Sequence, residues 1–205
     1  MKRIGLLGGT FDPIHHGHLV LAECAHYEAR LDRVIFVPAA RPPHKEAGPV
    51  VKGDYRYRMV RIAIEDNPHF AVSEVEMRRP GRSYTIDTVR EFRERYPGSE
   101  LYFIVGMDAL LEIKTWKDVD ELVRLCGFIA AVRPKYSQDL ADPRLAGLPD
   151  DFWRRLQLVE VPGLDISSTD LRRRLAAGKP VRYLMPPAVE DYVRRHNFYG
   201  GGTHD

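Results

Sequence analysis

The chain has 205 residues, 44% of them hydrophobic and 29% charged, which is the composition of an ordinary globular domain. Its 31 basic residues nearly balance its 29 acidic ones, so the overall charge argues against nucleic acid and against a membrane surface as partners. The low cysteine count, and the absence of a signal-peptide pattern and of an apolar run of about 20 residues, favour a cytoplasmic protein without disulfides.

The first quarter of the chain alternates apolar runs with helix-forming and loop-forming stretches. Residues 3–7 form a short apolar run that stops at glycines, which predicts a buried strand. Good helix formers follow from His18 to residue 30, and the β-branched and aromatic run at 33–38 predicts a second buried strand. Residues 39–53 carry paired prolines and glycines without periodicity and predict a loop.

The middle of the chain continues this alternation. A helical pattern covers residues 54–65, and the segment at 70–77 is expected to be extended. Apolar residues on successive turns predict a helix over 84–96. The runs at 101–106 and 127–132 predict two more buried strands.

The last third predicts a weaker strand at 158–161 and two helices, at 168–177 and 187–195. Strands that are apolar on both faces and alternate with helices are typical of a parallel sheet covered on both sides. The sequence therefore predicts an α/β fold, a doubly wound parallel sheet in three α/β/α layers. We expect a single domain over residues 1–199 and a disordered tail over 200–205.

The stretch GGTFDPIHHGHL follows the first predicted strand, where such sheets bind their ligands. Gly8 and Gly9 predict a tight turn and a close approach of backbone N–H groups to a ligand. The helix that follows points its N-terminus at the same place, which favours an anion. His15 and His18 can place two imidazole donors on a phosphate, with Gly17 leaving room between them.

Two other interpretations of this stretch stay open at this point. The glycines, together with Asp12 and Pro13, are also compatible with a plain turn and loop start. His15, His16 and His18 could also hold a metal ion, although the sequence supplies no fourth ligand at a suitable spacing.

A second motif, LDISSTDLRRRL, lies near the C-terminal end. Ser167 and Asp170 have the spacing of a capping box and predict a helix start. Capping does not account for the further hydroxyls of Ser168 and Thr169, or for Arg172 one turn later. Such donors at one helix N-terminus predict a second phosphate site, and two phosphate sites in one domain suggest a nucleoside triphosphate.

The two motifs, in this order, resemble the nucleotidyltransferase superfamily with an H-x-G-H motif near the start and an ISST-x-x-R motif near the end. The segments GRSYTIDT, LYFIVGMDALLEIKTWKD, PPHK and VRP resemble the bacterial nicotinate mononucleotide adenylyltransferases. The resemblance covers nearly the whole chain and implies a Rossmann-like nucleotidyltransferase fold. It also implies adenylyl transfer from ATP to nicotinate mononucleotide, giving deamido-NAD and pyrophosphate in NAD biosynthesis, with Mg²⁺ bound through the ATP phosphates.

The same resemblance implies a role for each matching residue. His15, His18, Lys45 and Arg172 are implied as the catalytic residues that contact the phosphates. The residues implied for ATP binding are Gly8, Gly9, Thr10, Phe11, Gly106, Asp108 on a ribose hydroxyl, Ile166, Ser167, Ser168 and Thr169. Those implied for the acceptor are Tyr84 and Thr85 on the carboxylate, Trp116 stacked on the pyridine ring, and Arg133 on the phosphate.

Two alternatives to this function remain. Phosphopantetheine adenylyltransferases share both phosphate motifs, but they are usually shorter, and the SYT segment and Trp116 argue against that group. A nucleotide-sensing module without turnover would have no need for both histidines, Lys45 and Arg172 together. Neither alternative involves nucleic acid or a membrane, and the sequence leaves homo-oligomerisation open.

Overall fold

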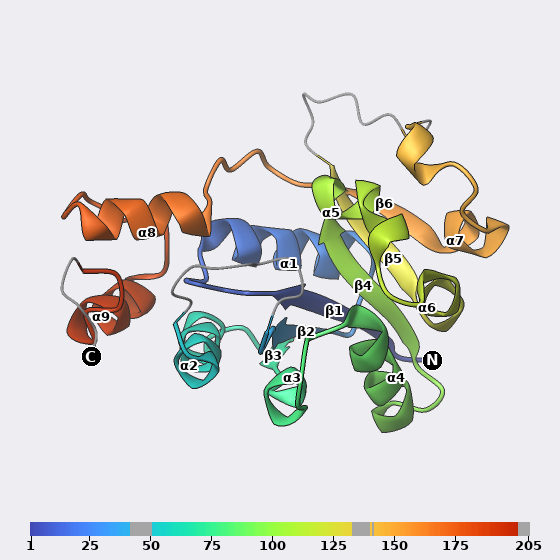
Figure 1. Ribbon diagram of the computed structural model, residues 1–205, viewed down its shortest axis with the longest axis horizontal. Helices are drawn as coiled ribbons and strands as arrows, with labels where there is room; N and C mark the ends of the chain where they lie inside the picture. The colour runs from blue at the N-terminus through green and yellow to red at the C-terminus, as the bar shows by residue number, and fades with distance from the viewer. Residues whose placement is uncertain (42–50, 133–139, 141, 201–205) are drawn as a thin grey trace.

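The computed structural model describes residues 1–41, 51–132, 140 and 142–200. In these residues six strands form one parallel sheet in the order β3-β2-β1-β4-β5-β6 (Figure 1). The strands are β1 (Arg3–Gly9), β2 (Arg33–Pro38), β3 (Phe70–Val72), β4 (Glu100–Gly106), β5 (Gly127–Val132) and β6 (Leu156–Glu160). The order reverses between β1 and β4, so the doubly wound parallel sheet expected from the sequence is confirmed.

Helices cover both faces of this sheet. They are α1 (His16–Glu28), α2 (Gly53–Ala63), α3 (Val75–Arg78), α4 (Thr85–Arg95), α5 (Met107–Leu111), α6 (Val119–Leu125), α7 (Asp150–Arg155), α8 (Ser168–Ala176) and α9 (Pro187–Arg195). Short 3₁₀ turns lie at Ile113–Thr115 and Pro143–Leu145. Among the described helices, none is both long and apolar enough to cross a membrane.

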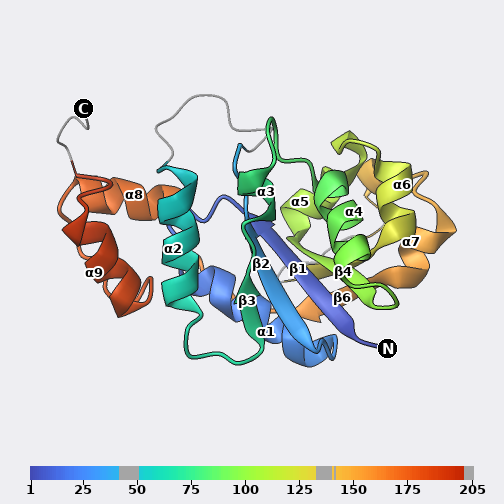
Figure 2. The same ribbon diagram turned by 90° about the horizontal axis from the view of Figure 1, so that it is seen from below.

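The alternation of side chains along β1 explains the two covered faces. Leu7 belongs to a buried cluster with residues of α1, α2 and α9, whereas Ile4 and Leu6 belong to a second cluster with residues of α4, α6 and α7. Figure 2 shows α1 on one side of β1 and α4 with α6 on the other. Successive side chains of a strand point to opposite faces, so an unbroken apolar run is what a sheet covered twice requires.

The structure corrects one predicted element and adds others. Only Phe70–Val72 of the segment expected to be extended is a strand, and Val75–Arg78 form the short helix α3. Glu74 and Arg78, one turn apart, pair across that helix, while Glu76 turns inward and is buried. Helices α5, α6 and α7 were not predicted, since each is shorter than the window in which a helical period becomes visible.

Two further predictions concern segments of which the structure describes only a part. The predicted loop at 39–53 lies outside the described residues over 42–50, and Gly53 belongs to helix α2. The predicted tail at 200–205 lies outside them except for Gly200. The remaining predicted helices agree with the structure apart from shifts at their ends, such as the start of α1 at His16 in place of His18.

Candidate active site

Two cavities lie at the carboxyl ends of β1 and β4, where the strand order reverses. The first, about 390 Å³, is lined by Gly17 of α1, by Asp108 of α5 and by the stretch from Val161 to Leu164, and is called here the α1 cavity. The second, about 320 Å³, is called the Trp116 cavity and is lined by residues that include Gly8, Gly9, His18, Glu76, Ser83, Thr85 and Trp116. Leu21 and Gly106 line both, so the two cavities adjoin. Such a switch point is where α/β sheets bind ligands.

The glycine pair ends β1 and does not form the predicted turn. Gly8 and Gly9 remain in the strand, and a Cβ added there would lie 2.8 Å from the Phe103 ring and 2.9 Å from the Phe11 ring, respectively. The positive φ of the turn falls instead on Phe11, at 49°. Small residues are therefore required by two aromatic rings, and the turn that presents the histidines begins two residues later than expected.

His15 and His18 lie side by side at the N-terminus of α1. Their rings stack with centroids 3.7 Å apart, and the backbone N–H of His15 donates to Nδ1 of His18 at 3.2 Å. Because a backbone N–H can only donate, Nδ1 of His18 is the acceptor nitrogen and Nε2 carries the hydrogen. His18 also lines the Trp116 cavity, and an imidazole N–H is a group that can donate to an anion.

His15 is the buried member of the pair, with 6% of its surface exposed. Burial, with repulsion from His16, lowers the pKa of His15 to about 4, so it is neutral near pH 7. A Cβ on Gly17 would lie 3.1 Å from the His15 ring, which supports the expectation that glycine leaves room there. Within the described part of the chain, no three His, Cys, Asp or Glu side chains are grouped to hold a metal ion, and His15, His16 and His18 belong to that part.

The second motif begins α8 and contacts the first one. Ser167 is the N-cap and its side chain accepts from the Asp170 N–H at 3.1 Å, as the capping-box spacing predicted. Ser168 Oγ donates to the Pro13 carbonyl at 2.9 Å, and an N–H of Arg172 donates to the Asp12 carbonyl at 2.7 Å. The tertiary fold thus brings together two motifs that lie more than 150 residues apart in the chain.

A first prediction separates the capping role of Ser167 from any role in binding. Ser167→Ala should lower the free energy of unfolding by about 1 kcal/mol, because the orphan N–H of the first turn loses its acceptor. Urea unfolding of the variant beside the wild type measures this difference. An unchanged midpoint would show that α8 does not depend on the Ser167 hydroxyl.

Asp108 lies in the first turn of α5 and faces the α1 cavity. The N-cap of α5 is Gly106, in extended conformation and without a side-chain cap, so Asp108 does not serve as the cap of this helix. Its carboxylate is exposed and lines the α1 cavity beside the end of β4. An exposed carboxylate at the carboxyl end of a strand can accept hydrogen bonds from hydroxyls.

The Trp116 cavity is bounded by the start of α4 on one side. Tyr84 is the N-cap of this helix, and Thr85, its first residue, lines the cavity with the free N–H groups of a helix start. Opposite, Trp116 is half-buried, its ring held edge-on by Phe103 at 5.7 Å and Phe128 at 6.5 Å. The cavity therefore combines an aromatic surface with backbone donors.

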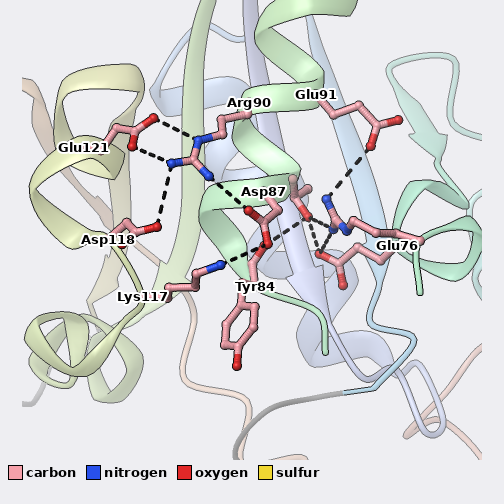
Figure 3. Close-up of polar contacts among 10 residues, drawn as sticks. Glu76, Tyr84, Asp87, Arg90, Glu91, Lys117, Asp118 and Glu121 are labelled. Atoms are coloured by element: carbon pink, nitrogen blue, oxygen red, sulfur yellow. Dashed lines mark hydrogen bonds and ion pairs between the residues drawn. The ribbon is translucent and has the colours of Figure 1, made fainter. Parts of the chain in front are cut away.

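Figure 3 shows the charged contacts that tie α4 to the segment that follows Trp116. Arg90 of α4 forms a two-point contact with Glu121 of α6, at 2.8 and 2.5 Å, and its remaining contacts reach Asp87 and Asp118. Lys117, next to Trp116, lies 3.7 Å from Asp87 and 4.7 Å from the centre of the Tyr84 ring. No pattern in the sequence indicates this network, since its charges become neighbours only when α4 packs on α6.

Glu76 is a second feature of the cavity that the sequence does not predict. It is 7% exposed, lines the Trp116 cavity and accepts from Thr88 Oγ1 at 2.6 Å. Burial raises the pKa of Glu76, against the opposing effect of its hydrogen bonds. No signal in the sequence marks it, because it lies in the segment that was expected to be a strand.

Two predicted site residues cannot be placed. Lys45 and Arg133 lie outside the described residues. Of the other predicted site residues, those that line a cavity are Gly8, Gly9, His18, Thr85, Gly106, Asp108 and Trp116. Thr10, Phe11 and His15 precede α1, and Tyr84 is the N-cap of α4. Ile166, Ser167, Ser168, Thr169 and Arg172 lie at the start of α8, and two of them, Ser168 and Arg172, contact the turn before α1.

Known proteins similar to this chain form a consistent group. The sequence model of the cytidylyltransferase-like family matches residues 6–174. A curated protein of Moorella thermoacetica, "Probable nicotinate-nucleotide adenylyltransferase", is 54% identical over 198 residues, which cover 96% of this chain and 91% of that protein. A protein with the same name from Symbiobacterium thermophilum is 46% identical, covering 97% of this chain and 96% of its own.

The solved structures agree on the fold. Plasmodium falciparum nicotinic acid mononucleotide adenylyltransferase complexed with NaAD superposes with a TM-score of 0.79 at 23% identity, covering 97% of this chain and 98% of that one. A structure from Vibrio parahaemolyticus, described as a nicotinate-nucleotide adenylyltransferase, has a TM-score of 0.68 at 19% identity and covers 98% of both chains. At these identities the likeness concerns the arrangement of helices and strands.

Proposed function

The chain belongs to the cytidylyltransferase-like family and, within it, to the nicotinate-nucleotide adenylyltransferases. We propose here which residues bind each substrate and which stabilise the transition state. The reaction is adenylyl transfer in NAD biosynthesis, and the substrates are small nucleotides. ATP occupies the α1 cavity, and nicotinate mononucleotide occupies the Trp116 cavity. One observation carries this assignment: the cavities adjoin at Leu21 and Gly106, with the histidine pair beside the junction.

In this proposal the acceptor phosphate attacks ATP directly. An oxygen of the acceptor phosphate forms a bond to the α-phosphorus, and the bond from that phosphorus to the oxygen bridging to the β-phosphate breaks. Pyrophosphate leaves with the electron pair, so no covalent intermediate with the protein is needed. The N–H of His18 Nε2 and the start of α1 face the phosphate on which negative charge accumulates, and this electrostatic stabilisation with positioning carries the catalysis.

The outer phosphates lie against the start of α8. The hydroxyl of Thr169, the N–H groups of the first turn of α8 and the guanidinium of Arg172 supply donors there, and Lys45 adds a positive charge from the loop. The Ser168 hydroxyl instead donates to the Pro13 carbonyl and fastens this helix start to the turn. Asp108 accepts from a ribose hydroxyl. Backbone groups complete the ATP site, from Thr10, Phe11, Gly106, Ile166 and Ser167. Gly8 and Gly9 line the Trp116 cavity and would contact ATP only where the two substrates meet.

The acceptor is held at both ends. Its pyridinium ring stacks on Trp116, because a positively charged ring is attracted to the face of an indole. Its carboxylate receives the free N–H groups at Tyr84 and Thr85, and Arg133 contacts its phosphate. Glu76 lines the same cavity, where its carboxyl group accepts from the Thr88 hydroxyl.

Mg²⁺ belongs to this proposal as a partner of the ATP phosphates. The donors around the phosphate site, such as His18, Thr169 and Arg172, suit an anion, whereas Mg²⁺ prefers carboxylate, carbonyl and phosphate oxygens. The phosphate oxygens would therefore hold the metal, which supplies further neutralisation of their charge.

Arg172→Ala tests the second motif. The variant should raise KM for ATP by about tenfold, because a charge-assisted contact to phosphate is lost. Arg173→Ala is the matched control, since Arg173 is exposed on the same helix and pairs with Asp170. A sharp fall of the unfolding midpoint at an unchanged KM would show that Arg172 only fastens α8 to the Asp12 carbonyl.

The function itself is tested with a panel of acceptors. Pyrophosphate release should require both ATP and nicotinate mononucleotide, and 4′-phosphopantetheine should not replace the mononucleotide. Pyrophosphate release from ATP with 4′-phosphopantetheine, but not with nicotinate mononucleotide, would favour the phosphopantetheine adenylyltransferases. ATP binding without any pyrophosphate release would favour a nucleotide sensor.

A further inference from the structure

The turn between β1 and α1 is held by side chains from three distant parts of the chain. Arg56 of α2 donates to the Thr10 carbonyl at 2.7 Å, while Ser168 and Arg172 of α8 donate to the Pro13 and Asp12 carbonyls. The fourth contact comes from beyond α9, where Tyr199 Oη donates to Asp12 Oδ1 at 2.5 Å. Carbonyls outside regular structure need such partners when they are buried.

Asp12 is the member of this turn that most needs compensation. It is only 2% exposed, and its carboxylate stands one residue after Phe11, which has the positive φ of 49°. A buried carboxylate is costly without hydrogen bonds and a nearby positive charge. Tyr199 supplies the hydrogen bond, and Arg56, itself 1% exposed, supplies the nearby charge.

Tyr199 is well placed to keep this bond. Burial and the neighbouring Asp12 carboxylate raise the pKa of Tyr199, so its hydroxyl keeps the proton that it donates. The preceding residue, Phe198, packs on Tyr55 of α2 at 4.8 Å and on His196 at 5.1 Å. These ring contacts fix the end of the chain against α2, and they bring Tyr199 under the turn.

We propose that Tyr199 is a positioning residue for ATP: its bond to Asp12 holds the turn that sets His15 and His18 against the phosphates. The proposal rests on the proposed function in one respect, the placement of the ATP phosphates at this turn. In this proposal Tyr199 supports the ATP site through the turn, because Tyr199 itself lines neither of the two cavities.

Tyr199→Phe tests this, because it removes the hydroxyl and keeps the ring. The variant should lose about tenfold in kcat/KM for ATP, as expected for a lost hydrogen bond to a charged group, while KM for nicotinate mononucleotide stays at the wild-type value. Tyr102→Phe is the matched control: it also loses a bond from a tyrosine hydroxyl to a carboxylate, that of Glu100 at 3.1 Å, but at the opposite end of the sheet. If Tyr199 were only structural, Tyr199→Phe would lower the unfolding midpoint without a selective loss of kcat/KM for ATP. That result would overturn the proposal.

A double-mutant cycle with Asp12→Asn tests whether Tyr199 acts through its bond to Asp12. If Tyr199 acts through Asp12, Tyr199→Phe should add little to the loss that Asp12→Asn causes alone, whereas losses that multiply would refute the coupling. ATP affinity measured by calorimetry without acceptor keeps this test separate from the proposed function. Weaker ATP binding in Tyr199→Phe supports the positioning role even if the wild type released no pyrophosphate, a result that would reject the proposed reaction alone.

Discussion

Replacing His18 with alanine is expected to lower kcat by roughly 10²–10³, the loss that follows removal of one preorganised donor from a charge-stabilising site. The structure gives the reason for choosing this histidine. The backbone N–H of His15 donates to Nδ1 of His18, so Nε2 carries the hydrogen that we expect to face the phosphate, while His15 is buried and neutral near pH 7. KM for the acceptor should change little, because the interaction strengthens as charge moves onto the reacting phosphate. Steady-state kinetics at saturating ATP and acceptor measure both quantities.

His16→Ala is the matched control for this experiment. His16 is the adjacent imidazole, and the contact that fixes it is its backbone N–H to the Leu184 carbonyl at 3.1 Å, which alanine keeps. This variant should retain kcat near that of the wild type. Near-normal turnover in His18→Ala would remove His18 from the mechanism.

The wild type is expected to prefer nicotinate mononucleotide over nicotinamide mononucleotide by roughly ten- to a hundredfold in kcat/KM, since each buried donor left unpaired costs about 1–3 kcal/mol. The start of α4 presents backbone N–H groups to the Trp116 cavity. Both oxygens of a carboxylate can accept from such donors. The amide of nicotinamide turns an NH₂ group toward them and leaves donors facing donors.

Trp116→Ala separates stacking from this discrimination. The indole stacks on either ring, so its loss should weaken both acceptors to a similar degree while the preference for nicotinate persists. Values of kcat/KM for both mononucleotides, in the wild type and in the variant, decide the matter. Equal use of the two acceptors by the wild type would contradict a carboxylate pocket at Thr85.

Local patterns in the sequence determined most of the sheet and the start of α8. The runs at Arg33–Pro38 and Gly127–Val132 are apolar on both faces, and such runs are stable only between two layers of helices. The cap of α8 was equally predictable, because Ser167 and the N–H that it accepts from are three residues apart. These features depend on neighbours along the chain, which the sequence displays directly.

Only the tertiary structure decided how the site is assembled. Glycines at the end of β1 were expected to form the turn, but the rings of Phe103 and Phe11 occupy the space beside them and the turn moves to Phe11. Glu76 became a wall of the Trp116 cavity because the chain leaves its edge strand after Val72 and forms α3.

The contacts that hold the turn between β1 and α1 show most clearly what the sequence alone does not reveal. Asp12 and Tyr199 are 187 residues apart, and neither position carries a local pattern that points to the other. Helical and strand periods report which face of an element is buried, but the partner of a buried polar group is set by the packing of whole elements. Here α2, α8 and the segment that follows α9 converge on one turn, and that convergence exists only in the folded chain.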